Sequence, residues 1–364
     1  MKIINPGKRG IHLLPFLILL LLFFCTSCMS TSMPFQENRD SWKFAVVSDT
    51  QGNNKNINKT CINDAVLQTI ADDIVREKPD LVIVAGDLVN GWFRNGGTNY
   101  GTQYKNWKIA MKSVYQAGIP VYPIRGNHDS GPERLILKPL PVHLEPPVDT
   151  PLILKESFRS SFAETYIPEN GPVNESRLTY SFVHKNSFFI AMDQFTEGQH
   201  KVNHGWLERL LAENKNTHFF IFGHEPAFGA DHMDNLGFYK KDRDIFWNAI
   251  GRAGGRTYFC GHDHFYNRSL ILDDEGHQIY QIIIGTGGGI LRKWSGHYQD
   301  GKRVKGEFHS NDYHGYLLVT VEGNKATIIW KALMTPGIMK SWKYLDTFTY
   351  SVPVQKKMRI VNVQ

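Results

Sequence analysis

The sequence predicts an α/β fold with two β-sheets in one domain and helices outside them. In the first half, short and continuously apolar segments alternate with helical segments, which is typical of parallel strands buried on both faces. In the second half, apolar segments follow one another more closely, which indicates antiparallel strands and a second sheet. The chain has 364 residues, of which 41% are hydrophobic, so it holds ample material for a core.

The elements of the first half follow a regular order. The segments 44–47, 81–85 and 121–124 are apolar throughout and predict strands. Between them, 62–75 carries apolar residues at helical spacing and is followed by Lys78-Pro79, which ends a helix. A second helix is expected over 107–116. Strand, helix, strand, helix, strand is the order of right-handed crossovers in a parallel sheet.

The second half begins after two irregular segments, a proline-rich insertion at 132–151 and a polar stretch at 168–176. Loops of this length are more often functional than connective, and the insertion is expected to border a binding site. Beyond them we expect a hairpin, two helices and several strands. The hairpin is 178–183 with 188–192, the helices are 206–212 and 245–250, and the strands are 219–222, 256–260, 269–272, 279–284, 316–321 and 326–330.

The amino end has the pattern of an export signal. Cationic residues precede an apolar run at 13–24, which is too short to span a bilayer comfortably. The small residues before Cys28 resemble a bacterial lipoprotein signal, which implies that Cys28 is lipidated and begins the mature chain. A plain secretory signal or an uncleaved anchor is the alternative. We therefore expect a lipoprotein-type signal peptide at 1–28, a tether at 29–40, a folded domain at 41–335 and a C-terminal extension at 336–364.

This organisation places the protein outside the cytoplasm, as a membrane-anchored lipoprotein of the bacterial cell envelope, in the periplasm or on the outer membrane. The formal charge is +6, and loss of Lys2, Lys8 and Arg9 with the signal lowers it to +3, since that segment has no acidic residue. Such a mildly basic surface gives no reason to expect nucleic acid other than as a possible substrate. After the signal only Cys61 and Cys260 remain, so the fold does not rest on disulfides.

Polar residues of a narrow chemical kind follow five of the predicted strands. Because alternate residues of an extended chain point to the same side, Asp49 and Gln51 should face one place. The carboxyl ends of strands in an α/β sheet form one edge, so the other four segments should meet there. The five segments are Asp49 with Gln51, Gly86-Asp87, Gly126-Asn127-His128-Asp129, Gly223-His224-Glu225 and Gly261-His262-Asp263-His264.

Carboxylate, amide and imidazole groups are ligands for divalent or trivalent metal ions. Taken singly, each segment has a structural explanation: an aspartate after a strand often caps a helix, and Gly-Asn often forms a turn. Taken together and in this order, they favour a shared metal site.

The ordered set D-x-[H/Q], GD, GNH[D/E], GH and GHxH resembles the signature of the calcineurin-like metallophosphoesterases, over roughly 43–333. Within it, GHDHFYNRS and IIIGTGGG resemble the purple acid phosphatase branch. The resemblance implies a four-layer α/β sandwich of two mixed β-sheets flanked by helices, the metallo-dependent phosphatase fold. It also implies hydrolysis of a phosphate monoester or diester.

The resemblance further implies two metal ions that share a hydroxide, the attacking group on phosphorus. His128 would protonate the leaving alcohol, and Asp129 would orient His128. The metal ligands carried over are Asp87 as the bridge, Asp49, Gln51 and His264 for one ion, and Asn127, His224 and His262 for the other.

Two positions depart from the purple acid phosphatase pattern. Those enzymes have a tyrosine three residues after the second aspartate, where this chain has Asn90, so we expect neither a phenolate ligand nor a purple colour. Gln51 offers only a neutral carbonyl oxygen, a harder and weaker donor than imidazole. Of the ions Mn, Fe and Zn, we therefore expect Mn or Fe rather than a tightly held zinc pair.

The remaining polar residues carry weaker predictions. Tyr266 and Arg268, just past the last motif, are candidates for substrate binding, with a turn cap or a surface pair as the alternative. His200, His204 and His218 are interpreted as surface or core residues, and the glycines at 285–289 as a tight turn near the metals. The function predicted is that of an exported, membrane-anchored, dinuclear metallophosphoesterase. The alternative is a catalytically idle surface protein that uses metals only to hold its loops for a binding partner.

Overall fold

The structure is a computed structural model, and it describes residues 41–52, 60–91, 100–131, 150–334 and 341–353. The predicted signal peptide with Cys28, the tether and most of the proline-rich insertion lie outside the described residues. The last two residues of the predicted insertion are helical, because a helix begins at Thr150. Within the described ranges, no helix is both long enough and apolar enough to cross a bilayer.

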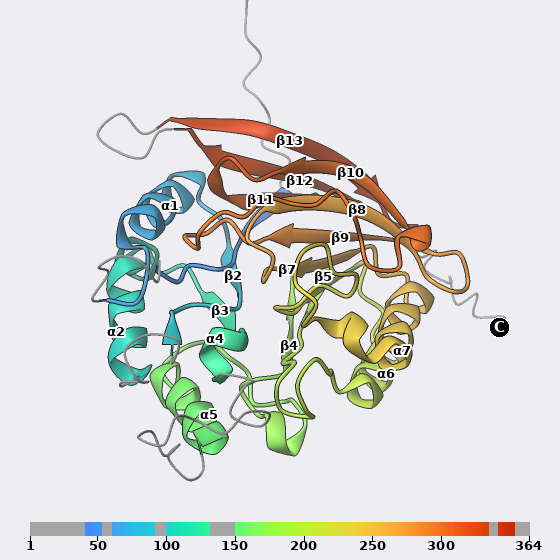
Figure 1. Ribbon diagram of the computed structural model, residues 1–364, viewed down its shortest axis with the longest axis horizontal. Coiled ribbons are helices and arrows are strands. Elements are labelled where there is room, and N and C mark those ends of the chain that lie inside the picture. The colour runs from blue at the N-terminus through green and yellow to red at the C-terminus, as the bar shows by residue number, and fades with distance from the viewer. Residues whose placement is uncertain (1–40, 53–59, 92–99, 132–149, 335–340, 354–364) are drawn as a thin grey trace, which may run out of the picture. The chain divides into compact units, whose positions relative to one another are not determined.

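Two mixed β-sheets form the centre of the fold (Figure 1). The first has the strand order β13-β12-β11-β1-β2-β3, with β1, β2 and β3 parallel and the others antiparallel. Its strands are β1 (Ser41–Val47), β2 (Leu81–Ala85), β3 (Val121–Ile124), β11 (His314–Glu322), β12 (Lys325–Leu333) and β13 (Trp342–Ser351).

The second sheet has the order β10-β8-β9-β7-β6-β5-β4, with a parallel centre of β5, β6, β7 and β9. Its strands are β4 (Tyr180–His184), β5 (Ser187–Ala191), β6 (His218–Phe222), β7 (Thr257–Cys260), β8 (Tyr266–Leu272), β9 (Gln278–Ile284) and β10 (Val304–Ser310). The prediction of two mixed sheets is confirmed.

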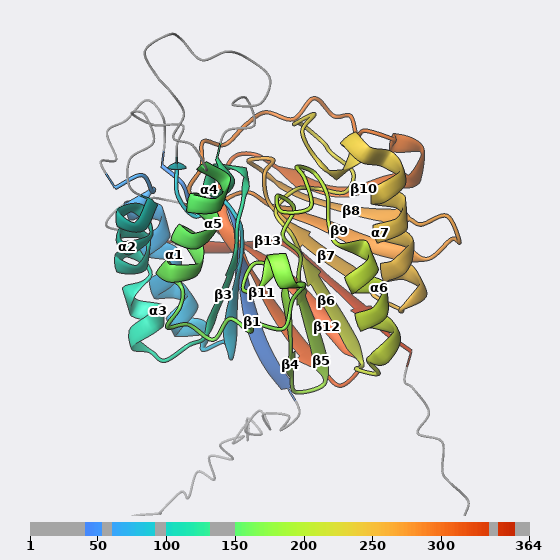
Figure 2. The same cartoon turned by 90° about the horizontal axis from the view of Figure 1, so that it is seen from below.

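Helices cover the outer face of each sheet, so that the domain has four layers (Figure 2). Beside the first sheet lie α1 (Asp64–Glu77), α2 (Tyr100–Ala110), α3 (Lys112–Gln116), α4 (Asn127–Ser130) and α5 (Thr150–Ser161). Beside the second lie α6 (His204–Glu213) and α7 (Lys240–Arg252). Three 3₁₀ turns complete the described elements: η3 (Val173–Glu175), η4 (Leu236–Tyr239) and η5 (Gly301–Arg303).

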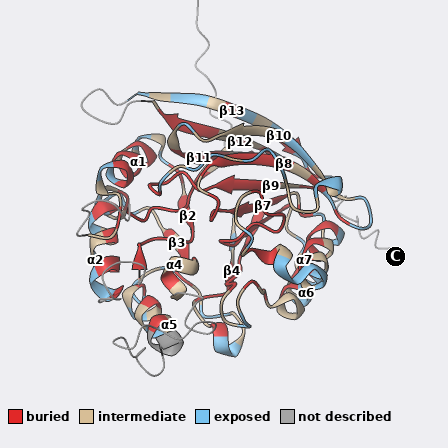
Figure 3. Ribbon diagram, in the orientation of Figure 1, coloured by how far each residue is buried: buried red, intermediate tan, exposed pale blue. Residues whose placement is uncertain are grey.

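The main core lies between the two sheets, where buried residues concentrate (Figure 3). The ring of Phe44 in β1 meets Phe189 in β5 edge-on at 5.1 Å and Phe220 in β6 at 4.8 Å between ring centres. All three side chains are buried. Burial of each such side chain contributes about 1.5–3 kcal/mol, and the edge-on geometry adds about 0.5–1.5 kcal/mol per pair. A second core, which includes Phe246 and Trp247, packs α7 against the second sheet.

Helix boundaries differ from the prediction where polar residues decide them. The first helix begins at Asp64 rather than at residue 62, because the side chain of Asn63 accepts a hydrogen bond from the amide of Val66 and caps it. The second helix begins at Tyr100, seven residues earlier than predicted, and Met111 separates it from α3. The first turns of α2 carry little apolar periodicity, so they were not predicted.

Strand β13 lies in the segment that the sequence analysis assigned to a C-terminal extension, so the folded domain continues past residue 335. From Asp346 onward, buried or half-buried residues alternate with exposed ones, and the strand pairs with β12 with one register shift, between Trp330 and Lys331. Two buried polar groups hold it to the domain. Asp346 accepts hydrogen bonds from Arg268 and Tyr266 of the second sheet, and Trp342 lies 5.5 Å from the ammonium group of Lys331.

Candidate metal centre

Sharp turns at the strand ends direct the predicted ligands toward one another. Asp49 and Asp87 follow β1 and β2 with φ of 56° and 49°, and His262 follows β7 with φ of 69°. Positive φ is uncommon for residues other than glycine and clusters at functional sites. The two aspartate loops are joined by hydrogen bonds from the amide of Asp49 to the carbonyl of Gly86 (3.1 Å) and from Thr50 to Asp87 (2.9 Å).

Two motif glycines stand where a side chain would strike a ligand. A Cβ atom on Gly126 would lie 2.0 Å from Oδ1 of Asp87, and one on Gly261 would lie 2.1 Å from Oδ2 of Asp49. Neither distance is possible for a real side chain, so glycine is required for the close approach of these loops. Steric exclusion therefore explains why glycine precedes the ligand residues in the Gly-Asn-His and Gly-His motifs.

The first predicted ligand set is brought together. Asp49 and Asp87, together with His224 of the second set, each offer a ligand atom, and these atoms lie within 4.8 Å of one another. Nε2 of His264 lies 3.4 Å from Oδ1 of Asp49. The amide of Gln51 lies between two of these groups, with its nitrogen 2.9 Å from Oδ2 of Asp87 and 3.1 Å from Nε2 of His264.

Gln51 has an orphaned atom at this position. Its side chain is buried, and Oε1 has no hydrogen-bond partner among the described residues. Rotation of the amide by 180° exchanges nitrogen and oxygen and would aim Oε1 at the space between Asp87 and His264. A cation there would favour the rotated amide, because only the oxygen can be a ligand.

The second predicted set also converges. Oδ1 of Asn127 lies 3.0 Å from Nε2 of His224 and 3.1 Å from Nδ1 of His262. The opposite nitrogen of His224 lies 2.9 Å from the carbonyl of Ala85. Since a carbonyl oxygen only accepts, that Nδ1 carries the proton, and the lone pair on Nε2 faces the cluster. His264 is fixed in the same way by the carbonyl of Ile290, at 2.9 Å.

The electrostatics of the cluster fit a pair of cations. Burial raises the pKa of Asp87 well above its usual value, and the charges of Asp49 and Asp129 raise it further. Burial would also raise the pKa of Asp49, but the hydrogen bond to His264 lowers it below its usual range.

Burial lowers the pKa of His224 to about 3, so its imidazole is neutral at neutral pH. Burial would lower the pKa of His262, but the adjacent carboxylate of Asp234 and the charge of Glu225 raise it to about 10, so a metal ion bound there would displace a proton. Carboxylate and imidazole groups together form a donor set for metal ions.

His128, the predicted proton donor, lies at the rim with 18% of its side chain exposed. Its backbone amide donates to Oδ1 of Asp87 at 2.9 Å, and its Nδ1 lies 2.9 Å from the carbonyl of Asn90. Nε2 is 3.8 Å from Oδ2 of Asp87, so this nitrogen faces the central carboxylate. Burial lowers the pKa of His128 to about 4 despite the bond to Asn90.

The role predicted for Asp129 is corrected by the structure. Its carboxylate accepts from the backbone amides of Gly126 (2.9 Å) and Leu88 (3.1 Å) and from the hydroxyl of Tyr104 (3.2 Å). It therefore holds the loop and caps α4, while the carbonyl of Asn90 orients His128. Burial raises the pKa of Asp129 to about 7.

The prediction that Tyr266 and Arg268 contact substrate is also corrected. Both side chains bind Asp346 of β13, with the Tyr266 hydroxyl at 2.8 Å and the Arg268 Nε at 2.7 Å. Arg268 further pairs with Glu307. Both residues belong to β8, two positions apart, so they share the face that packs toward the first sheet. Tyr266 is stacked on Trp330 of β12, with 4.4 Å between ring centres. These groups join the two sheets.

Two residues near the cluster were missed by the sequence analysis. The ring of His232 lies 4.4 Å from that of His262 and 6.3 Å from that of His264. Its Nδ1 bonds Oδ1 of Asp263 at 2.9 Å, and Asp263 also accepts from three backbone amides of the same loop. Asp234 lies 3.6 Å from Nε2 of His262. The sequence DHMD at 231–234 is the only available signal, and it does not directly follow a strand.

Two of the three histidines interpreted as surface or core residues have structural partners, and the third begins a helix. Buried His200 bonds Glu225 at 2.8 Å, and His218 lies 3.0 Å from the carbonyl of Gly323. His204 begins α6. The glycines at 285–289 form a turn beside the cluster, as predicted: the amides of Gly287 and Gly289 donate to the carbonyls of Ser48 and Asp49.

The fold consists of two mixed sheets between helical layers, with carboxylate, amide and imidazole groups at the strand ends. This combination is characteristic of the class of metal-dependent phosphoesterases. Residues 43–266 match the family model of the calcineurin-like phosphoesterases, and the chain belongs to this family. It is therefore a metallophosphoesterase, a hydrolase that acts on phosphate esters. The family predicted from the sequence is confirmed.

Solved structures of low sequence identity share the fold. Purple acid phosphatase PPD1 from yellow lupin (Lupinus luteus) is 15% identical, with a TM-score of 0.60 over 85% of this chain and 54% of that one. PhoD is 14% identical, with a TM-score of 0.60 over 86% and 70%. GAP50, described as the anchor in the inner membrane complex of Plasmodium, is 16% identical, with a TM-score of 0.51 over 87% and 91%. The chain thus spans about half of the lupin phosphatase. No curated protein matches by sequence.

The substitution Asp87→Asn should have opposite effects on stability with and without metal. In chelator at pH 8, we expect a higher unfolding temperature than in the wild type, because ionisation of Asp87 beside Asp49 and Asp129 destabilises the folded state. The folded pKa is raised, so the wild type loses stability as pH rises, and the difference should shrink toward pH 4. With Mn²⁺ the order should reverse, because asparagine cannot balance the cations.

Scanning calorimetry with EDTA and with Mn²⁺ measures both effects. A variant that is less stable than the wild type in EDTA at pH 8 would contradict the electrostatic explanation. Asp72→Asn, at a partly exposed position of α1, is the matched control and should change the free energy of unfolding by no more than about 0.5 kcal/mol in either condition.

Proposed function

We propose that the protein is a dinuclear metal-dependent phosphoesterase that hydrolyses phosphate monoesters or diesters. The observation that carries this proposal is the convergence of both predicted ligand sets into one cluster, in which Gln51 of one set and His224 of the other both contact Asp87. Seven side chains from five strand ends contribute to the cluster, and their donor atoms are of the types that metal ions bind.

In this proposal Asp49, Gln51 and His264 hold one ion, Asn127, His224 and His262 hold the other, and Asp87 is shared. When bound, such a pair supplies positive charge that activates a water molecule and stabilises the charge developing on a phosphate ester. The protein fixes the ligands beforehand. Backbone carbonyls select the tautomers of His224 and His264, and backbone amides of His262 and His128 hold the two carboxylates in place.

His128 is proposed to donate a proton to the leaving oxygen. Its Nδ1 donates to the carbonyl of Asn90, so Nε2 is the nitrogen that faces the cluster and can hand over a proton there. A phosphate ester beside it would bring negative charge, which favours the protonated imidazole. The partial exposure of His128 leaves room for a leaving group at the rim.

The alanine variant His128→Ala tests catalysis directly. We expect kcat to fall by about 10² to 10⁴, because a positioned proton donor is lost, while metal content stays intact. Rates with p-nitrophenyl phosphate and with its bis ester, both with Mn²⁺ supplied, measure the effect and separate monoesterase from diesterase activity. His297→Ala, at an exposed position, is the control and should retain the wild-type rate.

If neither ester is hydrolysed by the metal-loaded wild type and the variant binds the same metals, the alternative of a catalytically idle, metal-stabilised binding protein would be supported instead. Equal rates in the wild type and the variant would show that His128 is not the proton donor, while the proposal of phosphoesterase activity would stand.

The metals proposed are Mn or Fe rather than zinc. Gln51 supplies an oxygen where imidazole would hold zinc more tightly, and its orphaned Oε1 suits an oxygen-preferring ion. We expect Gln51→His to retain zinc through dialysis better than the wild type does, measured by elemental analysis. Two stoichiometric zinc ions retained by the wild type after dialysis would contradict the preference.

We also propose that the protein is exported to the bacterial cell envelope and anchored by a lipid on Cys28. The support is the sequence pattern alone, a cationic start, a short apolar run and small residues before Cys28. Labelling with a radioactive fatty acid should mark the wild type and not Cys28→Ser. Equal labelling of the two proteins would overturn the anchor, and Cys25→Ser is the matched control.

A further inference from the structure

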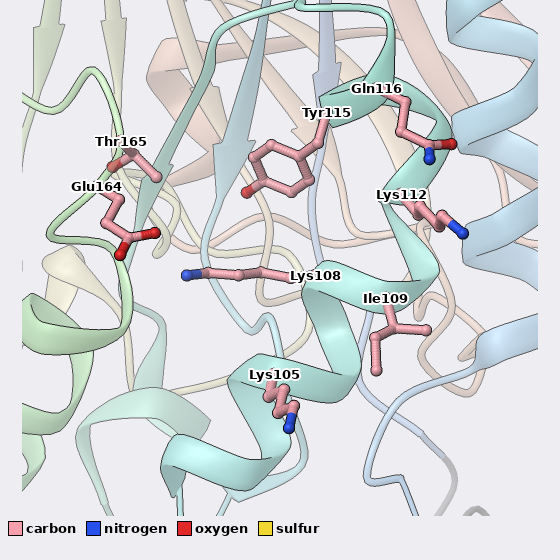
Figure 4. A pocket seen from close by; sticks show the side chains of 8 residues that line it. All are labelled: Lys105, Lys108, Ile109, Lys112, Tyr115, Gln116, Glu164 and Thr165. Atoms are coloured by element: carbon pink, nitrogen blue, oxygen red, sulfur yellow. The ribbon is translucent and has the colours of Figure 1, made fainter.

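A carboxylate without a role in the proposed mechanism lies beside the metal centre. It belongs to Asp234, whose Oδ1 is 3.6 Å from Nε2 of His262, one of the proposed metal ligands. The cavity of about 460 Å³ along α2 and α3 is not a comparable site. Two of the lysines that line it, Lys108 and Lys112, point to opposite sides and hold nothing in common (Figure 4).

The three histidines of the proposed ligand sets differ in how the nitrogen that faces away from the cluster is held. In His224 and His264 this nitrogen is Nδ1, and it lies 2.9 Å from a backbone carbonyl, that of Ala85 or of Ile290. These carbonyls fix the tautomer and the direction of each ring. In His262 the corresponding nitrogen is Nε2, and no described residue lies within hydrogen-bonding distance of it.

The two nitrogens of His262 serve different partners. Nδ1 lies 3.1 Å from Oδ1 of Asn127, another proposed ligand of the same ion. The nitrogens of an imidazole point in diverging directions, so Nε2 faces away from Asn127 and toward Asp234. The side chain of His262 is only 3% exposed. A buried N–H without an acceptor is costly, and the Asp234 carboxylate already lies next to this one.

The loop that carries Asp234 is held on both sides of this residue. Before it, the carboxylate of Asp263 accepts hydrogen bonds of 2.9 to 3.2 Å from the backbone amides of residues 230–232. After it, the side chain of Asn235 donates to the carbonyl of His232 at 2.6 Å. The backbone at Asp234 is therefore fixed. A small rotation of its side chain, which is 38% exposed, brings the carboxylate within hydrogen-bonding distance of Nε2.

Two other carboxylates act on His262 through their charge, those of Asp263 and Glu225. Both are held by other groups: Asp263 bonds His232 at 2.9 Å, and Glu225 bonds another histidine at 2.8 Å. Burial would raise the pKa of Asp234, but the contact with His262 lowers it below its usual range, so this carboxylate is charged at neutral pH. Asp234 is thus a charged acceptor placed behind the ring.

We propose that Asp234 is a positioning residue of the metal centre. Its carboxylate accepts the Nε2 proton of His262 and so keeps the lone pair of Nδ1 directed at the ion that this histidine holds. A carboxylate behind a metal-binding histidine fixes the ring and makes it a more basic ligand. A dication also gains more from this negative charge than does the single proton that it displaces from His262. This role rests on the proposed function, because it presupposes that His262 binds an ion.

Calorimetric titration of the chelator-treated full-length protein with Mn²⁺ alone tests this role. We expect the wild type to bind two ions. In Asp234→Ala one of them should bind about 10 to 100 times more weakly, and the other as in the wild type. Asp234→Asn keeps an acceptor oxygen without the charge, so it should recover part of the loss. If the alanine variant does not fold, the asparagine variant carries the test, with a loss in the same direction.

The matched control is Asp231→Ala. It removes the same charge from the same loop, at a carboxylate that lies 3.9 Å from Arg292, and it should bind both ions like the wild type. Two further backgrounds identify the affected ion. Added to His264→Ala, which lacks a ligand of the first ion, Asp234→Ala should weaken the remaining ion by the full factor. Added to Asn127→Ala, which lacks a ligand of the second, it should change the remaining ion by less than about twofold.

Equal Mn²⁺ affinities in the wild type and Asp234→Ala would overturn the role of Asp234. So would an equal loss in Asp231→Ala, because the cause would then be the charge of the loop and not the contact with His262. Since the readout is metal binding, a wild type that binds two ions but hydrolyses no phosphate ester would reject the enzyme and keep the positioning role. A wild type that binds fewer than two ions would overturn both.

Discussion

The site depends on one constraint: two carboxylates must be held side by side where both are buried from water. Asp49 and Asp87 are both buried, and the burial that removes water also removes its screening of their repulsion. The chain holds them there with backbone at positive φ and with glycines that allow close approach. Such an arrangement is unfavourable without compensating positive charge, and it survives because the surrounding strands are well packed.

The compensation involves both sheets. Asp49, Asp87 and Asn127 follow strands of the first sheet, whereas His224 and His262 follow strands of the second. Ions bound by these groups would therefore link the sheets at this edge, and metal affinity would be coupled to the stability of the sandwich. The buried ion pair between Arg125 and Asp193, with bonds of 2.9 and 2.8 Å, already joins β3 to the loop after β5. Polar contacts thus fix the edge, and the aromatic core fixes the middle.

Much of this could be predicted, for identifiable reasons. Strands buried on both faces are apolar throughout, so β2 and β3 were predicted with their observed limits. Their parallel order brings their ends to one edge, so the residues just beyond them were predicted to meet. The edge strands β10 and β13 are partly exposed and largely polar, and neither was predicted. His232 was missed because it is held at the cluster by Asp263, 31 residues away, and does not directly follow a predicted strand.

The errors at Tyr266 and Arg268 show where the site ends and the scaffold begins. His262 and His264 lie in the turn before β8, where the chain is free to aim both side chains at the cluster. From Tyr266 onward the chain is paired with β9 and β10, and alternation fixes the direction of every side chain. Tyr266 and Arg268 therefore share the face that Asp346 covers, 80 and 78 residues further along the chain. A motif indicates which residues share an edge, but the first paired residue of the next strand decides which of them can reach a substrate.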